Sequence, residues 1–268
     1  MIPILDGDVL CYQSSVMNDD DGTVAWGEGV ETGTKWAGLT TMIVDRKIDQ
    51  WCRLAGGGAM NCVIVFSDRD GENFRKDFCP HYKENRMDFE KPDEYYLARD
   101  YIEENYKTHT IPRLEGDDVL GLLATGPNGA KYVAVSTDKD IFTIPGTVLH
   151  VPHYNSKERP RILKNTMQKA DHYWMTQTLT GDTVDNYFGC PGVGKVGAEK
   201  VLHRRTTLRS MWEEVLMKYA EHHDHKRWGE KFRTDSAYDE ALMNARCARI
   251  LRYGDWNKET GEVNLWTP

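Results

Sequence analysis

The sequence predicts an α/β fold in which a mostly parallel central sheet is flanked by helices. Short apolar runs at residues 2–5, 62–66 and 132–136 end in polar residues, as the buried strands of such a sheet do. Helical patterns lie between these runs, and alternating strands and helices indicate a parallel sheet with covered faces. A chain of 268 residues, 40% of them hydrophobic, is long enough to bury a core of this kind.

The clearest helix follows the first strand, over residues 36–55. Its apolar residues, among them Trp36, Ile43 and Trp51, recur at helical spacing, and three glycines at 56–58 then end it. The segment 18–33 before this helix is predicted to be an exposed loop or hairpin. After about residue 165 the pattern is mostly helical, and residues 249–266 are expected to form a helix end, a turn and a short strand.

Composition narrows the class of protein. The six cysteines form no C-x-x-C pair and no charged segment precedes an apolar stretch at the start, so we expect a cytoplasmic protein without a disulfide framework. No apolar run approaches the roughly 18 residues of a membrane span. The net charge of −8 argues, at face value, against a nucleic-acid partner.

Carboxylates gather where the predicted sheet would place a site. Asp6 and Asp68 follow the first two strands, and Asp138 and Asp140 follow the third. The carboxyl ends of parallel strands line one edge, where such folds place their sites. Two further groups, Glu115 to Asp118 and Asp182 with Asp185, bring carboxylates three residues apart onto one helix face. The full set is Asp6, Asp68, Glu115, Asp117, Asp118, Asp138, Asp140, Asp182 and Asp185.

These nine carboxylates predict a metal site. A single Asp after a strand, or an acidic helix start, usually serves as a turn or capping residue, but capping does not predict recurrence in five clusters. Such a concentration repels itself unless divalent cations occupy it, and oxygen ligands suit Mg²⁺ or Mn²⁺. Two ions would clamp the attacking water and the leaving oxygen of a phosphodiester. Setting these carboxylates aside changes the net charge from −8 to +1, so the global charge excludes little.

The stretch 74–91 mixes basic and aromatic residues. This composition suits single-stranded nucleic acid, and a solvated amphipathic helix is the alternative. On a helix, Lys83 and Arg86 would share a face and could meet one phosphate. The basic residues are Arg75, Lys76, Lys83, Arg86 and Lys91, and the aromatic residues are Phe74, Phe78, Tyr82 and Phe89.

A glycine-rich turn follows the last acidic pair. Gly192 and Gly194 let the backbone approach a phosphate, and a helix beginning near Lys195 offers unpaired N–H groups and a positive charge. An ordinary helix-to-helix turn explains the Pro and Gly residues but not their position seven residues after an acid pair. The histidines at 222, 223 and 225 are interpreted as a solvated helix face rather than a zinc site.

Five motifs together resemble the flap endonuclease/5′-3′ exonuclease family. They are "ILDGD", "FSDRDGENFRKDFCPHYKENR", "LEGDDVLGLLA", "STDKDIFTIPG" and "GDTVDNYFGCPGVGKVGAEKVL", in the family's order. The ending "ARILRYGDWNKETGEVNLW" is similar to the gene six exonucleases of short-tailed phages. The resemblance implies a PIN-like nuclease core over residues 1–165 with a helical arch at about 74–105. It also implies a region 166–268 with a helix-three-turn-helix element at about 171–203 and a C-terminal segment that packs back on the core.

The resemblance also implies roles for individual residues. The nine carboxylates would bind two Mg²⁺ ions, for which Mn²⁺ can substitute, and Asp182 and Asp185 would complete that site. Lys83 and Arg86 match arch residues that face the scissile phosphate, and Tyr82 matches a position where a base can stack. DNA contacts are further expected from the remaining basic and turn residues, Arg75, Lys76, Gly192, Gly194 and Lys195. Turn carbonyls of such elements also bind K⁺.

The implied function is a metal-dependent 5′-3′ exodeoxyribonuclease. Its partners would be duplex DNA with 5′ ends, flaps or nicks, and RNA–DNA hybrids, in phage primer removal and host DNA degradation in the bacterial cytoplasm. The first alternative is a flap endonuclease acting mainly on branched DNA. A non-catalytic DNA-binding relative would be expected to lose several of the nine carboxylates, and a PIN-type ribonuclease would not need residues 181–202. Segments 18–33 and 203–240 receive no role.

Overall fold

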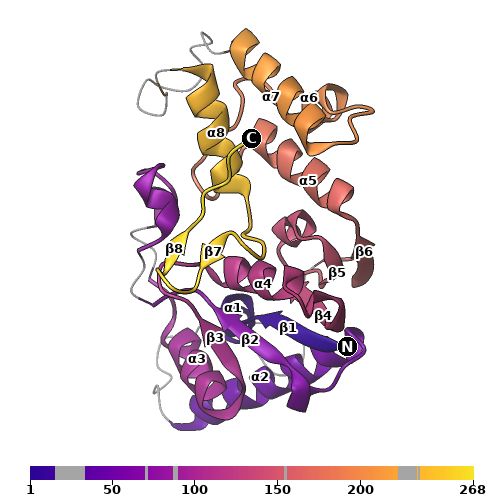
Figure 1. Cartoon of the computed structure of the whole chain (residues 1–268). Helices are drawn as coiled ribbons and strands as arrows, with labels where there is room; N and C mark the ends of the chain where they lie inside the picture. The colour runs from indigo at the N-terminus through magenta and orange to yellow at the C-terminus, as the bar shows by residue number, and fades with distance from the viewer. Residues whose placement is uncertain (16–33, 70–71, 87–89, 154–155, 223–233, 235) are drawn as a thin grey trace.

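The fold has two parts, a six-stranded sheet with its helices and a helical half beside it. The computed structural model describes residues 1–15, 34–69, 72–86, 90–153, 156–222, 234 and 236–268. Figure 1 shows the sheet in the lower part of the molecule and helices α5 to α8 above it. The segment predicted as a loop or hairpin at 18–33 lies outside the described residues.

The sheet is parallel except at one edge. Its strand order is β3-β2-β1-β4-β5-β6, and β6 alone among these strands runs antiparallel to its neighbour, β5. The strands are β1 (Ile2–Asp6), β2 (Val63–Phe66), β3 (Thr108–Thr110), β4 (Tyr132–Ser136), β5 (Gly146–His150) and β6 (Arg161–Asn165). The predicted strands at 2–5, 62–66 and 132–136 are confirmed as β1, β2 and β4. The mostly parallel α/β class is confirmed as well.

Helices cover both faces of the sheet, which explains why the central strands are apolar throughout. Alternate residues of a strand point to opposite faces, so Leu5 packs with α1 (Gly7–Ser15), α2 (Thr34–Leu54) and α3 (Asp93–Asn105). Its neighbour Ile4 packs on the other face with α4 (Gly116–Thr125). Strands buried on both faces are continuous hydrophobic runs rather than alternating ones. The helix predicted over 36–55 is confirmed as α2.

The helical half has its own core. It contains α5 (Met167–Thr180), α6 (Lys195–Val201), α7 (Leu208–His222) and α8 (Ala237–Ala248), which pack around residues such as Trp174 and Tyr219. The boundary predicted between residues 165 and 166 falls between β6 and α5. The mostly helical character predicted after residue 165 is confirmed.

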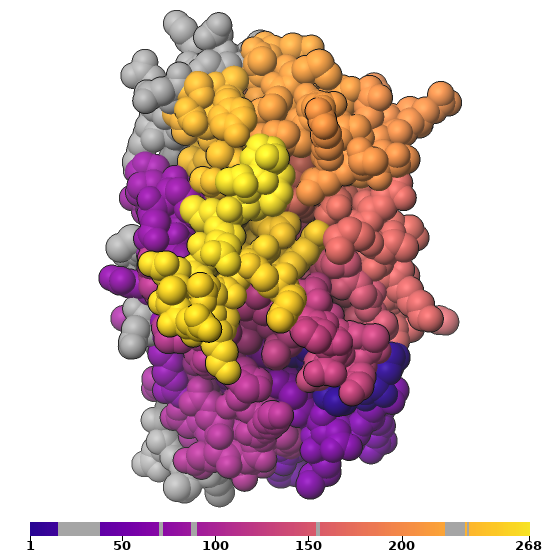
Figure 2. Space-filling view, in the orientation of Figure 1, coloured from indigo at the N-terminus to yellow at the C-terminus, as the bar shows by residue number. Residues whose placement is uncertain are grey.

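The C-terminal segment joins the two parts. After α8, Ile250 and Leu251 pack into the sheet's core, and a small hairpin of β7 (Trp256–Asn257) and β8 (Glu262–Val263) follows. The chain then returns, so that Trp266 packs edge-on against Trp174, with ring centroids 4.8 Å apart. Figure 2 shows this yellow segment lying over both parts.

The stretch that follows β2 differs from expectation. Over residues 74–91 the described residues form short 3₁₀ turns and no α-helix, so the predicted shared helical face of Lys83 and Arg86 is wrong. Pro80 interrupts the stretch, and Lys83 has a positive φ of 55°, which a right-handed helix does not allow. The side chains of Phe74, Cys79 and Tyr82 are buried, so tertiary packing rather than helix periodicity holds this segment. Among the described residues, the 3₁₀ turns are η1 (Ala59–Asn61), η2 (Phe74–Asp77), η3 (Glu84–Arg86), η4 (Gly129–Lys131) and η5 (Lys139–Thr143).

Candidate functional site

The site begins at the carboxyl end of the central strand. Asp6 ends β1 and is buried, with one carboxylate oxygen accepting a hydrogen bond from Val9 N (3.1 Å) and the other from Ser136 Oγ (2.7 Å). Ser136 ends the neighbouring strand β4, so this hydrogen bond joins two strand ends. Burial, and then the charge of Asp8, raise the pKa of Asp6 to about 7. The sheet therefore holds a carboxylate where its charge is disfavoured.

The turn after β4 adds two carboxylates. Asp138 caps η5 and accepts a hydrogen bond from Asp140 N (2.9 Å), while its own N–H donates to Ser136 Oγ (3.0 Å). Asp140 accepts from Gln177 Nε2 of α5 (2.5 Å). Burial raises the pKa of Asp140 to about 8, and the nearby carboxylates of Asp138, Asp185 and Asp182 add to that rise.

The first turn of α4 faces the same edge. Glu115 caps this helix, and Asp117 follows in its first turn. Burial raises the pKa of Asp117 well above its usual value, and the charges of Asp6 and Asp138 raise it further. Carboxylates from β1, from the turn after β4 and from α4 therefore share one desolvated region, as the sequence predicted for strand ends.

The loop after α5 brings the last acidic pair. Asp182 and Tyr187 exchange backbone hydrogen bonds (2.7 and 3.0 Å), which close a tight loop around Asp185. Asp182 also caps this loop by accepting from Val184 N (2.7 Å). Burial raises the pKa of Asp185, against the lowering effects of Lys83 and Arg86. Both aspartates interact electrostatically with Asp140, so the helical half contributes to the same site.

Two cations reach the site from the segment after β2. Lys83 Nζ pairs with Glu115 and lies 3.5 Å from an Asp185 oxygen, and Arg86 Nη2 lies 2.5 Å from the other Asp185 oxygen. Burial opposes ionisation of Glu115, but Lys83 and Arg75 hold its pKa at about 2. The same pairing raises the pKa of Lys83 despite its burial. Although no helix joins them, the two predicted cations meet at one carboxylate.

The structure contradicts the prediction that Asp118 binds a metal ion. Asp118 is fully buried, and its two oxygens accept from the Arg75 guanidinium at 2.7 and 2.8 Å. Leu251 N donates to the same carboxylate (3.1 Å). With its oxygens occupied by these donors, Asp118 stabilises the fold behind the site instead of facing a metal.

The structure also contradicts the prediction that Arg75 contacts DNA, because this side chain lies in the interior and not on the surface. Its exposed fraction is 3%, and beyond Asp118 it donates to the carbonyl oxygens of Cys247 and Arg249. These bonds join the segment after β2 to the C-terminal segment. The sequence showed a basic residue among aromatic ones but not its buried partner, which is 43 residues away.

The prediction that Tyr82 stacks on a base is wrong as well. Tyr82 is 2% exposed and packs against Tyr187, with ring centroids 6.4 Å apart and a 23° angle between planes. Its hydroxyl lies 2.9 Å from Glu115 and 3.1 Å from Asp185. A buried ring cannot stack on a base, so Tyr82 orients these two carboxylates instead.

Asp68 and Asp8 complete the comparison of sequence and structure. Asp68 accepts from Arg113 N (2.8 Å), which holds it on the loop before α4. Asp8, which sequence reasoning missed, accepts from Ser67 N and Oγ (2.8 and 2.6 Å) and from Tyr95 OH (2.5 Å). Ser67 Oγ in turn accepts from Gly116 N (3.0 Å), so Asp8 helps to place the acidic start of α4. The motif "ILDGD" contained Asp8, but its position beyond the strand end gave no signal of this role.

The predicted DNA-binding turn lies between α5 and α6. Gly192 is exposed and has a φ of +78°, a conformation that glycine adopts without strain. Gly194 precedes α6, and its Cβ position is open to solvent. Lys195 begins α6 and is exposed, as is Lys76 in η2. Of the histidines at 222, 223 and 225, the first ends α7 and the other two lie outside the described residues.

The site suits divalent cations by the chemistry of its oxygen donors rather than by a ready-made coordination geometry. In the part of the chain that the structure describes, no three acidic, histidine or cysteine side chains are arranged to hold an ion together. The donors are nevertheless oxygens, as Mg²⁺ prefers. Burial, and then the charges of neighbouring carboxylates, raise the pKa values of Asp6, Asp117 and Asp140, and a bound cation would offset both effects. The donor set thus fits a divalent cation, while Lys83 and Arg86 provide the neutralising charge in this structure.

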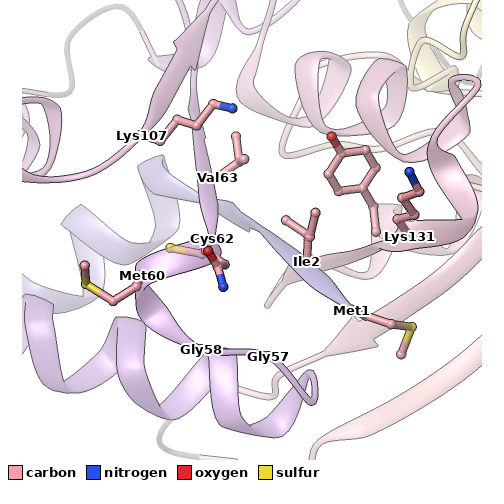
Figure 3. A pocket seen from close by; sticks show the side chains of 11 residues that line it. Met1, Ile2, Gly57, Gly58, Met60, Cys62, Val63, Lys107 and Lys131 are labelled. Carbon is pink, nitrogen blue, oxygen red and sulfur yellow. The ribbon is translucent and has the colours of Figure 1, made fainter.

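One cavity in the described part of the chain lies away from these carboxylates. Figure 3 shows its lining at the amino ends of β1, β2 and β4, opposite the acidic edge. It has a volume of about 830 Å³ and is lined by residues such as Ile2, Cys62, Lys107 and Tyr132, without any carboxylate. Among the described helices, none is long and apolar enough to cross a membrane.

Comparison with known proteins connects this geometry to a family. Residues 2–172 match the family model described as "5′-3′ exonuclease, N-terminal resolvase-like domain". The exonuclease of Escherichia phage T7 is 30% identical over the whole chain and 93% of its own length. The exodeoxyribonuclease of Enterobacteria phage T3 is 28% identical with the same coverage.

Solved structures share the fold. The D15 protein of T5, co-crystallised with metal ions, aligns with a TM-score of 0.58 at 14% identity, over 92% of this chain and 90% of that one. A complex of the bacteriophage T5 flap endonuclease with DNA and metal ions aligns with a TM-score of 0.59 at 14% identity, over 91% and 87% of the two chains.

Proposed function

Because this chain belongs to the 5′-3′ exonuclease family and is thus a nuclease that hydrolyses phosphodiester bonds, we propose that it is a metal-dependent exonuclease acting on duplex DNA from 5′ ends. The proposal extends to 5′ flaps and to the RNA of RNA–DNA hybrids. The biological roles we propose are primer removal and host DNA breakdown during phage growth, in the bacterial cytoplasm. The PIN-like α/β fold and membership in a nuclease family argue against the non-catalytic alternative.

One observation carries the proposal. Carboxylates from four separate segments converge on the carboxyl edge of the sheet, where burial first, and then the charges of nearby carboxylates, raise the pKa values of Asp6, Asp117 and Asp140. A fold gains nothing in stability from gathering buried like charges. Strongly perturbed groups of this kind mark functional sites.

The residues proposed to hold two Mg²⁺ ions, with Mn²⁺ able to substitute, are those that face this edge: Asp6, Glu115, Asp117, Asp138, Asp140, Asp182 and Asp185. Asp68 stays in the proposal as an outer member, because its carboxylate is tied to the loop before α4. When bound, such ions lower the pKa of water and stabilise the charge that develops during phosphodiester hydrolysis.

The chain's own cations have a separate role. Lys83 and Arg86 end at the rim of the acidic edge, where both contact Asp185. A phosphodiester at this rim would meet both side chains, and positive groups fixed in advance stabilise the negative charge that grows during the reaction. Lys83 and Arg86 are therefore proposed as catalytic residues.

Duplex DNA is proposed to bind along α5, the following loop and α6. Gly192 and Gly194 would let a phosphate approach the backbone, and Lys195 would add a positive charge. Carbonyl groups of this turn are the proposed K⁺ ligands. Lys76 is exposed and would contact DNA from the segment after β2.

The test compares four substrates in Mg²⁺ and in EDTA: blunt duplex, nicked duplex, 5′ flap and RNA–DNA hybrid, each labelled at its 5′ or its 3′ end. We expect short labelled products from 5′-labelled duplex, and no cleavage in EDTA. Cleavage that persists in EDTA would contradict the metal-dependent mechanism. Cleavage confined to flap junctions would assign the chain to the flap endonuclease alternative.

A further inference from the structure

We propose that Gln177 is a positioning residue, which holds Asp140 in place from the helical half of the molecule and thereby sets the affinity of the site for divalent cations. This inference rests on the proposed metal-dependent function. Gln177 lies on α5, whereas Asp140 lies on η5 directly after β4. The contact therefore crosses from one half of the fold to the other.

The hydrogen bond is partly buried. Gln177 is 9% exposed, and its Nε2 donates to an Asp140 oxygen at 2.5 Å. A neutral amide that donates to a carboxylate favours the charged form without adding a competing charge. Lys83 and Arg86, by contrast, contact Glu115 and Asp185.

Other contacts fix α5 against η5 and so orient Gln177. Tyr173 packs edge-on against Phe142, with ring centroids 5.6 Å apart. Arg252 donates both to Asp171 on α5 (2.7 Å) and to the carbonyl oxygen of Thr143 at the end of η5 (2.9 Å). These contacts place helix and turn in a fixed relation, in which the amide of Gln177 reaches the carboxylate.

The other end of the same amide points to a ligand. Gln177 Oε1 is buried and has no hydrogen-bond partner within the described chain. It belongs to the amide group that contacts Asp140, so it lies close to that carboxylate. Buried side-chain acceptors are rarely left unpaired, and an unpaired one beside a charged site is explained by a donor, such as a water molecule, that joins the site with its ligand.

The charges around Asp140 show why positioning matters. Asp138, Asp182 and Asp185 all oppose its ionisation. Without the amide, this carboxylate could turn away from its neighbours and reduce the repulsion. Residues that hold a metal-ligating carboxylate typically change metal affinity or activity by about 10–100-fold when mutated.

The experiment measures metal binding directly. Gln177→Met keeps the length of the side chain but removes both hydrogen-bonding atoms. Gln168→Met is the matched control, because Gln168 lies on the same helix and is exposed. Mn²⁺ binding is measured by calorimetry without DNA, cleavage is measured across Mg²⁺ concentrations, and thermal unfolding in EDTA reports the fold.

For Gln177→Met we expect Mn²⁺ affinity to fall about 10-fold or more and the Mg²⁺ concentration for half-maximal cleavage to rise in parallel. Gln168→Met should match the wild type in both. If Gln177→Met does not fold, Gln177→Asn decides the question, because its shorter side chain keeps an amide that cannot reach Asp140, and the same loss is expected.

Two results overturn the inference in distinguishable ways. If the wild-type protein binds Mn²⁺ while a folded Gln177 variant binds it within about twofold of the same affinity, the positioning role is wrong and the proposed function stands. If the wild-type protein binds no Mn²⁺ and cleaves in EDTA, the metal-dependent function itself fails, and this inference with it.

Discussion

The buried pair of Arg75 and Asp118 lies directly behind the acidic site. Both side chains are almost fully buried, and Arg75 is also enclosed by the rings of Phe74 and Tyr82, at 4.6 and 5.5 Å from its guanidinium carbon. The pair gives the fold a bidentate link among the segment after β2, α4 and the C-terminal segment. A basic residue close to a predicted nucleic-acid segment can therefore serve the fold alone.

Arg75→Ala should accordingly be strongly destabilising. It would leave Asp118 as an uncompensated buried charge, and breaking such a pair costs about 3–5 kcal/mol of unfolding free energy. Urea denaturation of the two proteins measures this loss. Arg209→Ala is the control, since Arg209 and Glu213 form an exposed pair on α7 worth about 1 kcal/mol or less. Similar losses for both variants would contradict the structural role of Arg75.

Replacing Lys83 tests the catalytic role proposed for this side chain. We expect Lys83→Ala to leave duplex affinity nearly intact and to lower the single-turnover cleavage rate by roughly two to three orders of magnitude, as loss of one charge-stabilising group does. Affinity is measured in Ca²⁺ and the rate in Mg²⁺ on one substrate. Equal losses of affinity and rate would mean that this lysine only anchors DNA.

At the scale of elements, the loop between α5 and α6 has two roles. Its first part carries Asp182 and Asp185 to the acidic site, and its second part exposes Gly192 and leads directly into the exposed Lys195 at the start of α6. Gly181 and Gly189 make this arrangement possible, because both have a positive φ and their backbones lie very close together. A Cβ on Gly181 would lie 2.4 Å from Gly189 N, and a Cβ on Gly189 would lie 2.3 Å from Gly181 N. A single loop thus connects the proposed duplex-binding turn to the carboxylates.

Lys195→Ala should weaken duplex binding and reduce the slope of log affinity against log salt concentration by about one unit, the effect of one lost phosphate contact. Fluorescence anisotropy at several salt concentrations measures both. Lys200→Ala provides the control, since Lys200 is exposed on the same short helix at a different face. An unchanged slope for Lys195→Ala would place the duplex grip elsewhere.

At the scale of the whole molecule, the two halves together create the acidic site. Its carboxylates come from the sheet edge, from α4 and from the loop after α5, and burial raises the pKa of Asp6 and Asp140 to about 7 and 8. A carboxyl whose pKa is higher in the folded than in the unfolded chain adds stability below the unfolded pKa. This stability is lost as pH rises through the folded value.

Asp140→Asn should therefore stabilise the metal-free protein at high pH. In EDTA we expect the two proteins to have similar unfolding free energies near pH 4, and the variant to gain at least about 1 kcal/mol over wild type by pH 8, the linkage energy of one pKa unit. Histidine titration is common to both proteins and cancels in this difference. If the difference in unfolding free energy between the two proteins stays constant with pH, or shrinks as pH rises, the repulsion inferred at Asp140 is contradicted.

The sequence by itself determined the sheet class, the strands β1, β2 and β4, and the segments that carry the acidic site. Apolar runs that end in Asp6 or Ser136 are local signals, since they follow from the covering of both faces and from the shared edge of parallel strands. Only the tertiary structure decided which members of those segments face the edge. Asp117 and Asp118 are adjacent, yet one joins the site while the other is paired with Arg75, because successive residues of a helix point about 100° apart. The burial of Tyr82, the role of Asp8 and the contact of Gln177 with Asp140 likewise depend on partners distant in the chain, and no local pattern encodes such partners.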